Sequence, residues 1–209
     1  MNKTRAYPLL ALLLTLALAS CLKQADDTIL VHDPQRIPFI TDEPWSHELL
    51  RLFGEEHVNF GDTPPTLDGY AFASRHQYAA TNLPQGESPD IGSTSPVQYF
   101  HRFDNQYLQV CRYRGMNSSD GVTNTADSAF VTGHDSLFTA YWLETRTTGG
   151  SPTLAVVLSG TVTPNGITDY RYGYQILRYD DHDIPFNVYP QGSVFVFQSP
   201  DSLSLYTPW

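Results

Sequence analysis

The segment LSGTVTPNGITDYRYGYQIL (residues 158–177) contains two β-strand patterns separated by the dipeptide Asn-Gly. Asn-Gly between two such patterns predicts a tight hairpin with positive φ at both turn positions. Successive side chains of a strand point to opposite faces of the sheet. The second arm therefore places Tyr170, Tyr172 and Tyr174 together on one face, and Ile167 on the other.

Short β-like runs separated by Gly, Pro, Asn and Asp continue through the chain from residue 67 onward. Short antiparallel runs joined by hairpins favour a barrel or a sandwich, because either arrangement limits exposed strand edges. The predicted fold class is all-β: an antiparallel barrel or sandwich of eight to nine short strands, with one short N-terminal helix. The predicted strands lie near residues 67–74, 75–82, 97–103, 106–114, 128–133, 137–146, 153–162, 167–178 and 192–198.

One α-helix is predicted ahead of the strands. Asp42 can cap it, Pro44 suits its first turn, and Gly54 stands where it should end. Its apolar residues recur at i, i+4, i+7 and i+8 and form one stripe: Trp45, Leu49, Leu52 and Phe53.

The segment HELLRLFGEEH (residues 47–57), which begins in this helix and runs past its end, matches the zinc-protease pattern H-E-x-x-H-x-x-G-x-x-H at every fixed position except Arg51. A guanidinium stays protonated and offers no lone pair, so Arg51 cannot replace the second zinc ligand. We therefore interpret the motif as a helix that packs on the core, and we predict no metal site.

The N-terminus has the layout of an export signal: Lys3 and Arg5 precede an apolar run over residues 9–18. That run is shorter than the roughly 20 residues a membrane-spanning helix needs. It ends in Leu-Ala-Ser-Cys (residues 18–21), which resembles the lipobox of bacterial lipoproteins. The resemblance implies cleavage before Cys21 and acylation of that residue, which would attach the protein stably to a membrane.

The alternative is ordinary secretion, because Ala17-Leu18-Ala19 also fits an A-x-A cleavage site. With lipidation, residues 1–20 are the signal peptide, residues 21–41 a flexible tether and residues 42–209 a single β domain. In lipoproteins of this kind an aspartate after the cysteine favours the inner membrane. Leu22 therefore favours the outer membrane, and residues 23–27 resemble a surface-export tag, with the periplasmic and surface leaflets both left open.

Charge and lysine usage exclude several functions. The chain carries 12 Lys and Arg against 22 Asp and Glu. Without the two cations of residues 1–20 the net charge is −12, which repels nucleic acids. Lys23 is the last lysine, so Schiff-base chemistry and a P-loop lysine are excluded from the folded domain. We predict no cofactor and no nucleic-acid partner.

The remaining motifs give weak signals for chemistry. Cys111 lies in a strand-like run, where a free thiol usually behaves as a small buried hydrophobe, and no internal disulfide is expected once Cys21 is acylated. The loop Asp180-Asp181-His182-Asp183 has oxygen ligands for a cation but lacks the alternating spacing of a calcium loop. No G-x-S-x-G occurs, and the seven histidines are scattered. We predict no catalytic residues.

The order of elements, a short helix, a first strand containing LDGYAF (residues 67–72) and then a meander, is similar to the calycin (lipocalin-like) arrangement. The stretches FTAYW (residues 138–142) and LSGT (residues 158–161) also resemble a group of uncharacterised bacterial surface lipoproteins. That second resemblance implies no activity.

We therefore expect a non-catalytic, lipid-anchored envelope protein. Tyr170, Tyr172 and Tyr174 are its candidate ligand-binding residues, because tyrosines on one face give apolar area and hydroxyl groups that orient a small hydrophobic or glycan ligand. A component of a surface assembly with other envelope proteins fits the sequence equally well. The alternative is an envelope hydrolase acting on glycans, since a pair of carboxylates brought together by the fold is invisible in one sequence.

Overall fold

The structure is a computed structural model that describes residues 44–119, 121, 123–146, 152–179, 189–201 and 203–207. All of them belong to the unit Pro34–Trp209. The prediction of an all-β fold with one short helix is confirmed in the described residues. The elements in chain order are α2 (Pro44–Phe53), the 3-10 turn η1 (Glu55–His57), β1 (Ala71–Thr81), β2 (Thr94–Tyr107), β3 (Val110–Asn117), β4 (Thr123–His134), β5 (Leu137–Thr145), β6 (Pro152–Thr163), β7 (Gly166–Tyr179), β8 (Val194–Gln198) and β9 (Leu203–Leu205).

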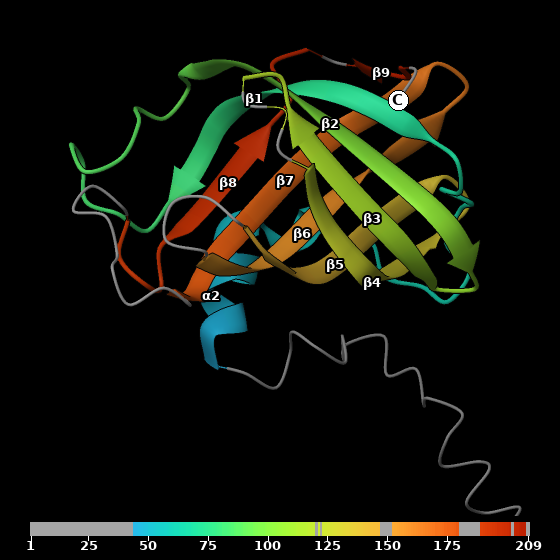
Figure 1. Cartoon of the computed structure of the whole chain (residues 1–209), viewed down its shortest axis with the longest axis horizontal. Coiled ribbons are helices and arrows are strands. Elements are labelled where there is room, and N and C mark those ends of the chain that lie inside the picture. Colours follow the sequence, from blue (N-terminus) through green and yellow to red (C-terminus); the bar gives the residue numbers. More distant parts are fainter. Residues whose placement is uncertain are drawn as a thin grey trace, which may run out of the picture. The chain divides into compact units, whose positions relative to one another are not determined.

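The first eight strands form a closed barrel (Figure 1). Each pairs antiparallel with the next one along the chain, and β8 pairs with β1 through contacts such as Tyr78 opposite Phe197. That last pairing decides for the barrel over the sandwich. Because strand direction alternates, β1, β3, β5 and β7 all finish at one end of the barrel, which we call the open end.

The predicted strands differ from the structure near the beginning and near the end of the described chain. Predicted strands 67–74 and 75–82 are one strand, β1, which continues through the predicted break; its register with β2 shifts close by, between Arg75 and Gln77. The strand that sequence analysis missed is β9, which is three residues long and pairs with the first residues of β7. Together β8 and β9 fill the space between β1 and β7, since Tyr206 then bridges to Phe72 of β1.

The hairpin between β6 and β7 is confirmed, but its turn lies one residue earlier than predicted. Thr163 pairs with Gly166, so the two loop residues are Pro164 and Asn165. The proline ring fixes φ near −65° at the first loop position. Only Gly166 has positive φ, at 154°, and the prediction of two positive-φ residues is wrong.

Strand β7 also departs from regular alternation. Asp169 has a φ of 53°, and the register with β6 shifts so that two residues of β7 stand opposite Gly160. This bulge resets the alternation of side chains. Ile167, predicted to face away from the tyrosines, therefore packs in the same interior cluster as Tyr170.

Apolar and aromatic side chains fill the barrel interior. Inward and outward positions alternate along the strands between the bulges, and the rings of Phe72, Phe103 and Phe138 are fully buried in the interior. Cys111 belongs to this cluster, and burial, with Asp68 and Asp104 as smaller causes, raises the pKa of its thiol to about 12. The prediction that Cys111 is a buried hydrophobe is confirmed.

Helix α2 packs on the outside of the barrel, across β7 and β8. Leu49 and Phe53 are fully buried there against outward-facing residues such as Val157 and Val196. Gly173 makes this approach possible, because a Cβ at that position would lie 3.0 Å from Phe53 Cδ2. The predicted end at Gly54 is confirmed, with a φ of 91° and an N–H that donates to Leu50 O.

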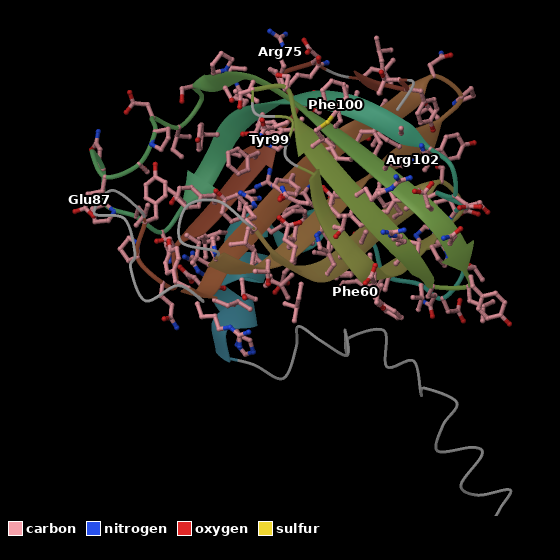
Figure 2. All side chains as sticks on the ribbon, in the orientation of Figure 1. Phe60, Arg75, Glu87, Tyr99, Phe100 and Arg102 are labelled. Carbon is pink, nitrogen blue, oxygen red and sulfur yellow. The ribbon has the colours of Figure 1, made fainter. Side chains whose placement is uncertain are left out.

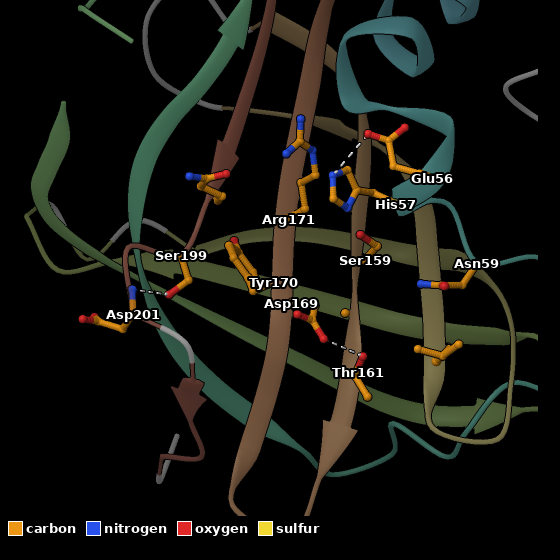
Figure 3. A pocket seen from close by; sticks show the side chains of 13 residues that line it. Glu56, His57, Asn59, Ser159, Thr161, Asp169, Tyr170, Arg171, Ser199 and Asp201 are labelled. Atoms are coloured by element: carbon orange, nitrogen blue, oxygen red, sulfur yellow. Dashed lines mark hydrogen bonds and ion pairs between the residues drawn. The ribbon is translucent and has the colours of Figure 1, made fainter. Parts of the chain in front are cut away.

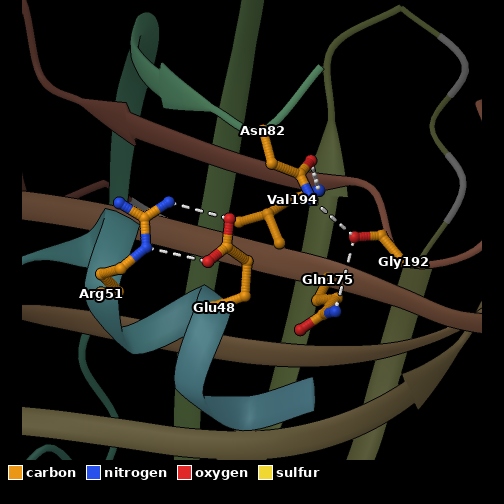
Figure 4. Close-up of polar contacts among 6 residues, drawn as sticks. All are labelled: Glu48, Arg51, Asn82, Gln175, Gly192 and Val194. Carbon is orange, nitrogen blue, oxygen red and sulfur yellow. Dashed lines mark hydrogen bonds and ion pairs between the residues drawn. The ribbon is translucent and has the colours of Figure 1, made fainter. Parts of the chain in front are cut away.

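The first two ligand positions of the zinc-protease pattern, His47 and Arg51, lie on the exposed side of this helix. Arg51, at the second ligand position, donates from Nε and Nη2 to the two carboxylate oxygens of Glu48 at 2.8 Å each (Figure 4). Glu48 is thus held as an ion-pair partner. The described ranges contain no cluster of three or more His, Cys, Asp or Glu side chains that could hold a metal ion.

Two loops of the open end are joined by side-chain contacts. Asn82, after β1, donates to Gly192 O at 3.0 Å and accepts from Val194 N at 2.8 Å (Figure 4).

None of the helices in the described segments is both long and apolar enough to cross a bilayer.

Candidate functional site

Polar side chains gather inside the barrel toward its open end. Strand alternation puts them there: Tyr99, labelled in Figure 2, faces inward together with His101 and Phe103, two and four residues further along β2. Other parts of the chain add polar groups that are joined to one another by hydrogen bonds. The set comprises His76, Tyr99, His101, Tyr113, Glu144, Arg146, Tyr170, Tyr172 and Tyr174.

The structure places the three predicted ligand-binding tyrosines on the inward face of β7, where they do different things. Tyr170 is fully buried and bonds to two histidines. The hydroxyl of Tyr172 accepts a hydrogen bond from Arg146 Nη2 at 3.2 Å. The ring of Tyr174 lies beneath the same guanidinium, whose Cζ is 4.9 Å from the ring centroid. Only Tyr172 lines the cavity described below.

A chain of four hydrogen-bonding groups crosses the barrel interior. His76 Nε2 lies 2.7 Å from Tyr170 Oη, which lies 2.9 Å from His101 Nε2. His101 Nδ1 in turn lies 2.9 Å from Tyr113 Oη. Burial lowers the pKa of His101 to about 3, and burial, with His101 and Arg146 nearby, lowers the pKa of His76 well below its ordinary value. Both imidazoles are therefore neutral at neutral pH.

The one ion pair of the described interior sits next to this chain. Arg146 donates from Nε to Glu144 Oε1 at 3.0 Å, and Trp142 Nε1 donates to Glu144 Oε2 at 2.9 Å. Both carboxylate oxygens are thus occupied. Only 1% of the Glu144 side chain is exposed, against 27% of Arg146. The carboxylate is therefore enclosed, whereas part of the Arg146 side chain borders open space.

That space is a small cavity of about 100 Å³ at the open end. For comparison, one water molecule occupies about 30 Å³ in the liquid. Among the described residues, the lining contains one cation and no carboxylate. The lining residues are Tyr99, Phe100, His101, Tyr113, Gly115, Met116, Asn117, Asn124, Arg146 and Tyr172.

Comparisons with protein-family models, curated proteins and solved structures found no match to this chain.

A larger groove of about 620 Å³ lies on the outer surface, between η1 and strands β6 and β7 (Figure 3). Three carboxylates line it, and each has a partner. Asp169 accepts from Thr161 at 3.2 Å, Asp201 pairs with Arg75, and Glu56 lies 3.6 Å from His57. Burial, followed by the charge of Arg171, lowers the pKa of His57. The groove has a mixed polar lining without a single dominant charge.

Sequence reasoning found the tyrosines but missed their partners. His76 and His101 are 25 residues apart in sequence, and the strand pairing brings their ring centroids to 5.9 Å. Polar residues at inward strand positions were the available signal, because each of them interrupts an apolar face. Cys21 and Asp180-Asp181-His182-Asp183 lie outside the described residues, so the lipidation site and the acidic loop stay predictions.

Proposed function

We propose that this chain is a lipid-anchored envelope protein that binds a small ligand at the open end of its barrel, without catalysing a reaction. The observation that carries the proposal is the cavity itself. Aromatic rings and one cation line it, and its walls come from the strands β2, β3, β4 and β7 and from Arg146 directly after β5. Apolar walls with a few convergent polar groups are typical of small-molecule sites.

The chemistry of the interior supports binding over glycan hydrolysis. Glycosidases use two carboxylic groups about 5–10 Å apart, one of which exchanges a proton with the substrate. Glu144 is the one carboxylate in the described part of the interior, and Arg146 and Trp142 hold both of its oxygens. A carboxylate fixed in this way by a cation and an N–H is poorly suited to general acid catalysis.

The size of the cavity sets the size of the ligand. Sites for drug-sized molecules measure about 300–1,000 Å³, several times the volume found here. A ligand of a few non-hydrogen atoms, or the end group of a longer molecule, fits the space. A sugar chain would have to bind outside the barrel.

Thermal unfolding of the mature chain in the presence of a panel of small organic molecules tests the proposal. We expect at least one compound to raise Tm in a saturable way, because a ligand that binds only the folded state stabilises it. Tyr172→Phe should weaken that shift. Tyr206→Phe is the matched control, since its hydroxyl bonds to Thr163 O, at the other end of the barrel.

Two outcomes would contradict the proposal. One is the lack of any saturable shift across the panel. The other is a shift that Tyr172→Phe leaves unchanged.

A further inference from the structure

The two members of the ion pair next to the cavity, Arg146 and Glu144, are unequally exposed. Of the five N–H groups of Arg146, two have partners among the described residues: Nε–H bonds to Glu144, and one Nη2–H bonds to Tyr172. Glu144 lies behind the guanidinium and is almost completely enclosed. A molecule in the cavity therefore meets the cation directly and is separated from the compensating carboxylate.

The two tyrosine hydroxyls at the cavity can act as donors. Tyr172 Oη accepts from Arg146, which leaves its own O–H free to point elsewhere. Tyr113 Oη lies over Gly115, where a Cβ would overlap it. Glycine at this position thus lets the Tyr113 hydroxyl reach the cavity wall beside His101.

The hydrogen bonds that link His76, Tyr170, His101 and Tyr113 can have their donors and acceptors arranged in two ways. In one, Tyr113 donates to His101 Nδ1, His101 Nε2–H donates to Tyr170, and Tyr170 donates to His76 Nε2. In the other, His76 Nε2–H donates to Tyr170, Tyr170 donates to His101 Nε2, and His101 Nδ1–H donates to Tyr113. Each imidazole keeps one proton and each phenol keeps one, so only the tautomers differ. The second direction leaves the Tyr113 O–H to point into the cavity.

We propose that the cavity binds a small carboxylate, whose oxygens accept hydrogen bonds from Arg146, Tyr172 and Tyr113. This inference rests on the proposed ligand-binding role and names its ligand class. A guanidinium and two hydroxyls arranged around one space form a donor set for an anion, and charge-assisted bonds of this kind are the strong ones. A cationic ligand is disfavoured, because it would face the Arg146 charge without a lining carboxylate.

Carboxylate binding also selects one direction of the hydrogen-bond chain. An anion next to Tyr113 accepts its O–H, and His101 must then donate from Nδ1 to Tyr113. The bound state therefore has a defined tautomer at both histidines. The tautomer of these buried histidines is therefore a specific readout, because a ligand bound on the outer surface would not change it.

Titration of the mature chain with sodium acetate at pH 7 and constant ionic strength tests the inference. Acetamide is the neutral control of the same shape. We expect saturable quenching or enhancement of Trp142 fluorescence, because that indole bonds to Glu144 and its ring centroid lies 4.0 Å from that of Tyr113. A ligand of four heavy atoms has few contacts, so the expected Kd is on the order of millimolar, with acetamide at least tenfold weaker.

Variants locate the site. Arg146→Gln combined with Glu144→Gln removes the cation without leaving a buried carboxylate unpaired, and it should weaken acetate binding tenfold or more. Tyr113→Phe should weaken it several-fold and abolish the acetate-dependent change in His101 ring ¹⁵N shifts toward the Nδ1–H tautomer. Tyr206→Phe should change neither measurement. The thermal unfolding of each variant establishes that it is folded.

The inference is overturned if acetate fails to bind, if acetamide binds as tightly as acetate, or if the double variant binds acetate like the wild type. The experiments distinguish a wrong ligand class from a wrong proposed function. If acetate has no effect but another compound gives a shift in Tm that depends on Tyr172, the carboxylate is wrong and the binding role stands. If no compound gives such a shift, both proposals fall.

Discussion

At the scale of single residues, His76 and His101 determine how the fold responds to acid. In the unfolded chain their pKa is near 6.5, whereas burial lowers the pKa of His101 to about 3 and that of His76 well below its ordinary value. Below pH 6.5 the unfolded state therefore binds more protons than the folded state. The stability that is present above pH 6.5 should fall as the pH decreases from 6.5 toward about 3.

The free energy of unfolding should change by about 1.4 kcal/mol per pH unit for each histidine, or by roughly 2.7 kcal/mol per pH unit for the pair. Urea unfolding at pH 7, 6 and 5 measures it. His76→Gln combined with His101→Gln should flatten the pH dependence between pH 6.5 and 4, whatever the absolute stability of the variant. An unchanged slope in this variant would show that other groups take up the protons.

Residue-scale prediction succeeded where the cause is local. Tyr170, Tyr172 and Tyr174 share a face because alternation holds along β7 after residue 169. The prediction for Ile167 failed because Asp169 adopts a left-handed conformation opposite Gly160, which depends on the pairing with β6. The partners of the tyrosines come from other strands, so a local pattern could mark each of them as an inward polar residue but could not show which tyrosine it contacts.

At the scale of elements, the contact between α2 and β7 can be tested by a double-mutant cycle. Gly173→Ala puts a Cβ 3.0 Å from Phe53 Cδ2 and 3.4 Å from Leu49 Cδ1. Overpacking of this kind typically costs about 1–3 kcal/mol. Phe53→Ala alone should cost about 3–5 kcal/mol, because it leaves a cavity beneath the helix.

In the Phe53→Ala background the ring that obstructs the new methyl group is gone, so Gly173→Ala should cost at least 1 kcal/mol less there than in the wild type. Urea unfolding of the four proteins gives the coupling. Arg51→Ala is the control on the same helix, and it should change stability by less than about 1 kcal/mol because the ion pair with Glu48 is exposed. Additive costs would mean that α2 moves away from β7 when the alanine is introduced.

The elements that were predicted correctly have their sequence signals within their own residues. Helix α2 has an apolar stripe, a proline in its first turn and a glycine at its end, all within a few residues. By contrast, β9 consists of Leu203–Leu205, which become a strand only because Gly166–Thr168 offer an edge 35 or more residues earlier. A three-residue strand has too little periodicity to be recognised from its own sequence.

At the scale of the whole molecule, closure of the barrel is the feature that could not be predicted from the sequence. The hairpins between consecutive strands follow from local turn signals. Closure requires β1 to pair with β8, and Gln77 lies opposite Gln198, 121 residues later. A meander that closes and a meander that folds into two sheets have the same local pattern, so barrel and sandwich could not be separated before the pairing was known.

Membrane attachment belongs to the same scale, because it concerns the whole domain. If Cys21 carries acyl chains, each buried methylene contributes about 0.8 kcal/mol to membrane binding, and two or more chains give stable attachment. Residues 21–209, with a net charge of −12, would offer no electrostatic attraction to anionic lipids. The lipid at residue 21 should therefore decide where the whole molecule partitions.

A detergent phase separation of bacterial extracts tests this prediction. The wild-type protein should enter the detergent phase, and a form with residues 1–21 replaced by an ordinary cleavable secretion signal should stay in the aqueous phase. Cys111→Ser is the matched control: the thiol of Cys111 lies inside the barrel, so this variant should partition like the wild type. Wild-type protein found wholly in the aqueous phase would contradict acylation, and a triacylated N-terminal Cys21 peptide in mass spectrometry would establish it directly.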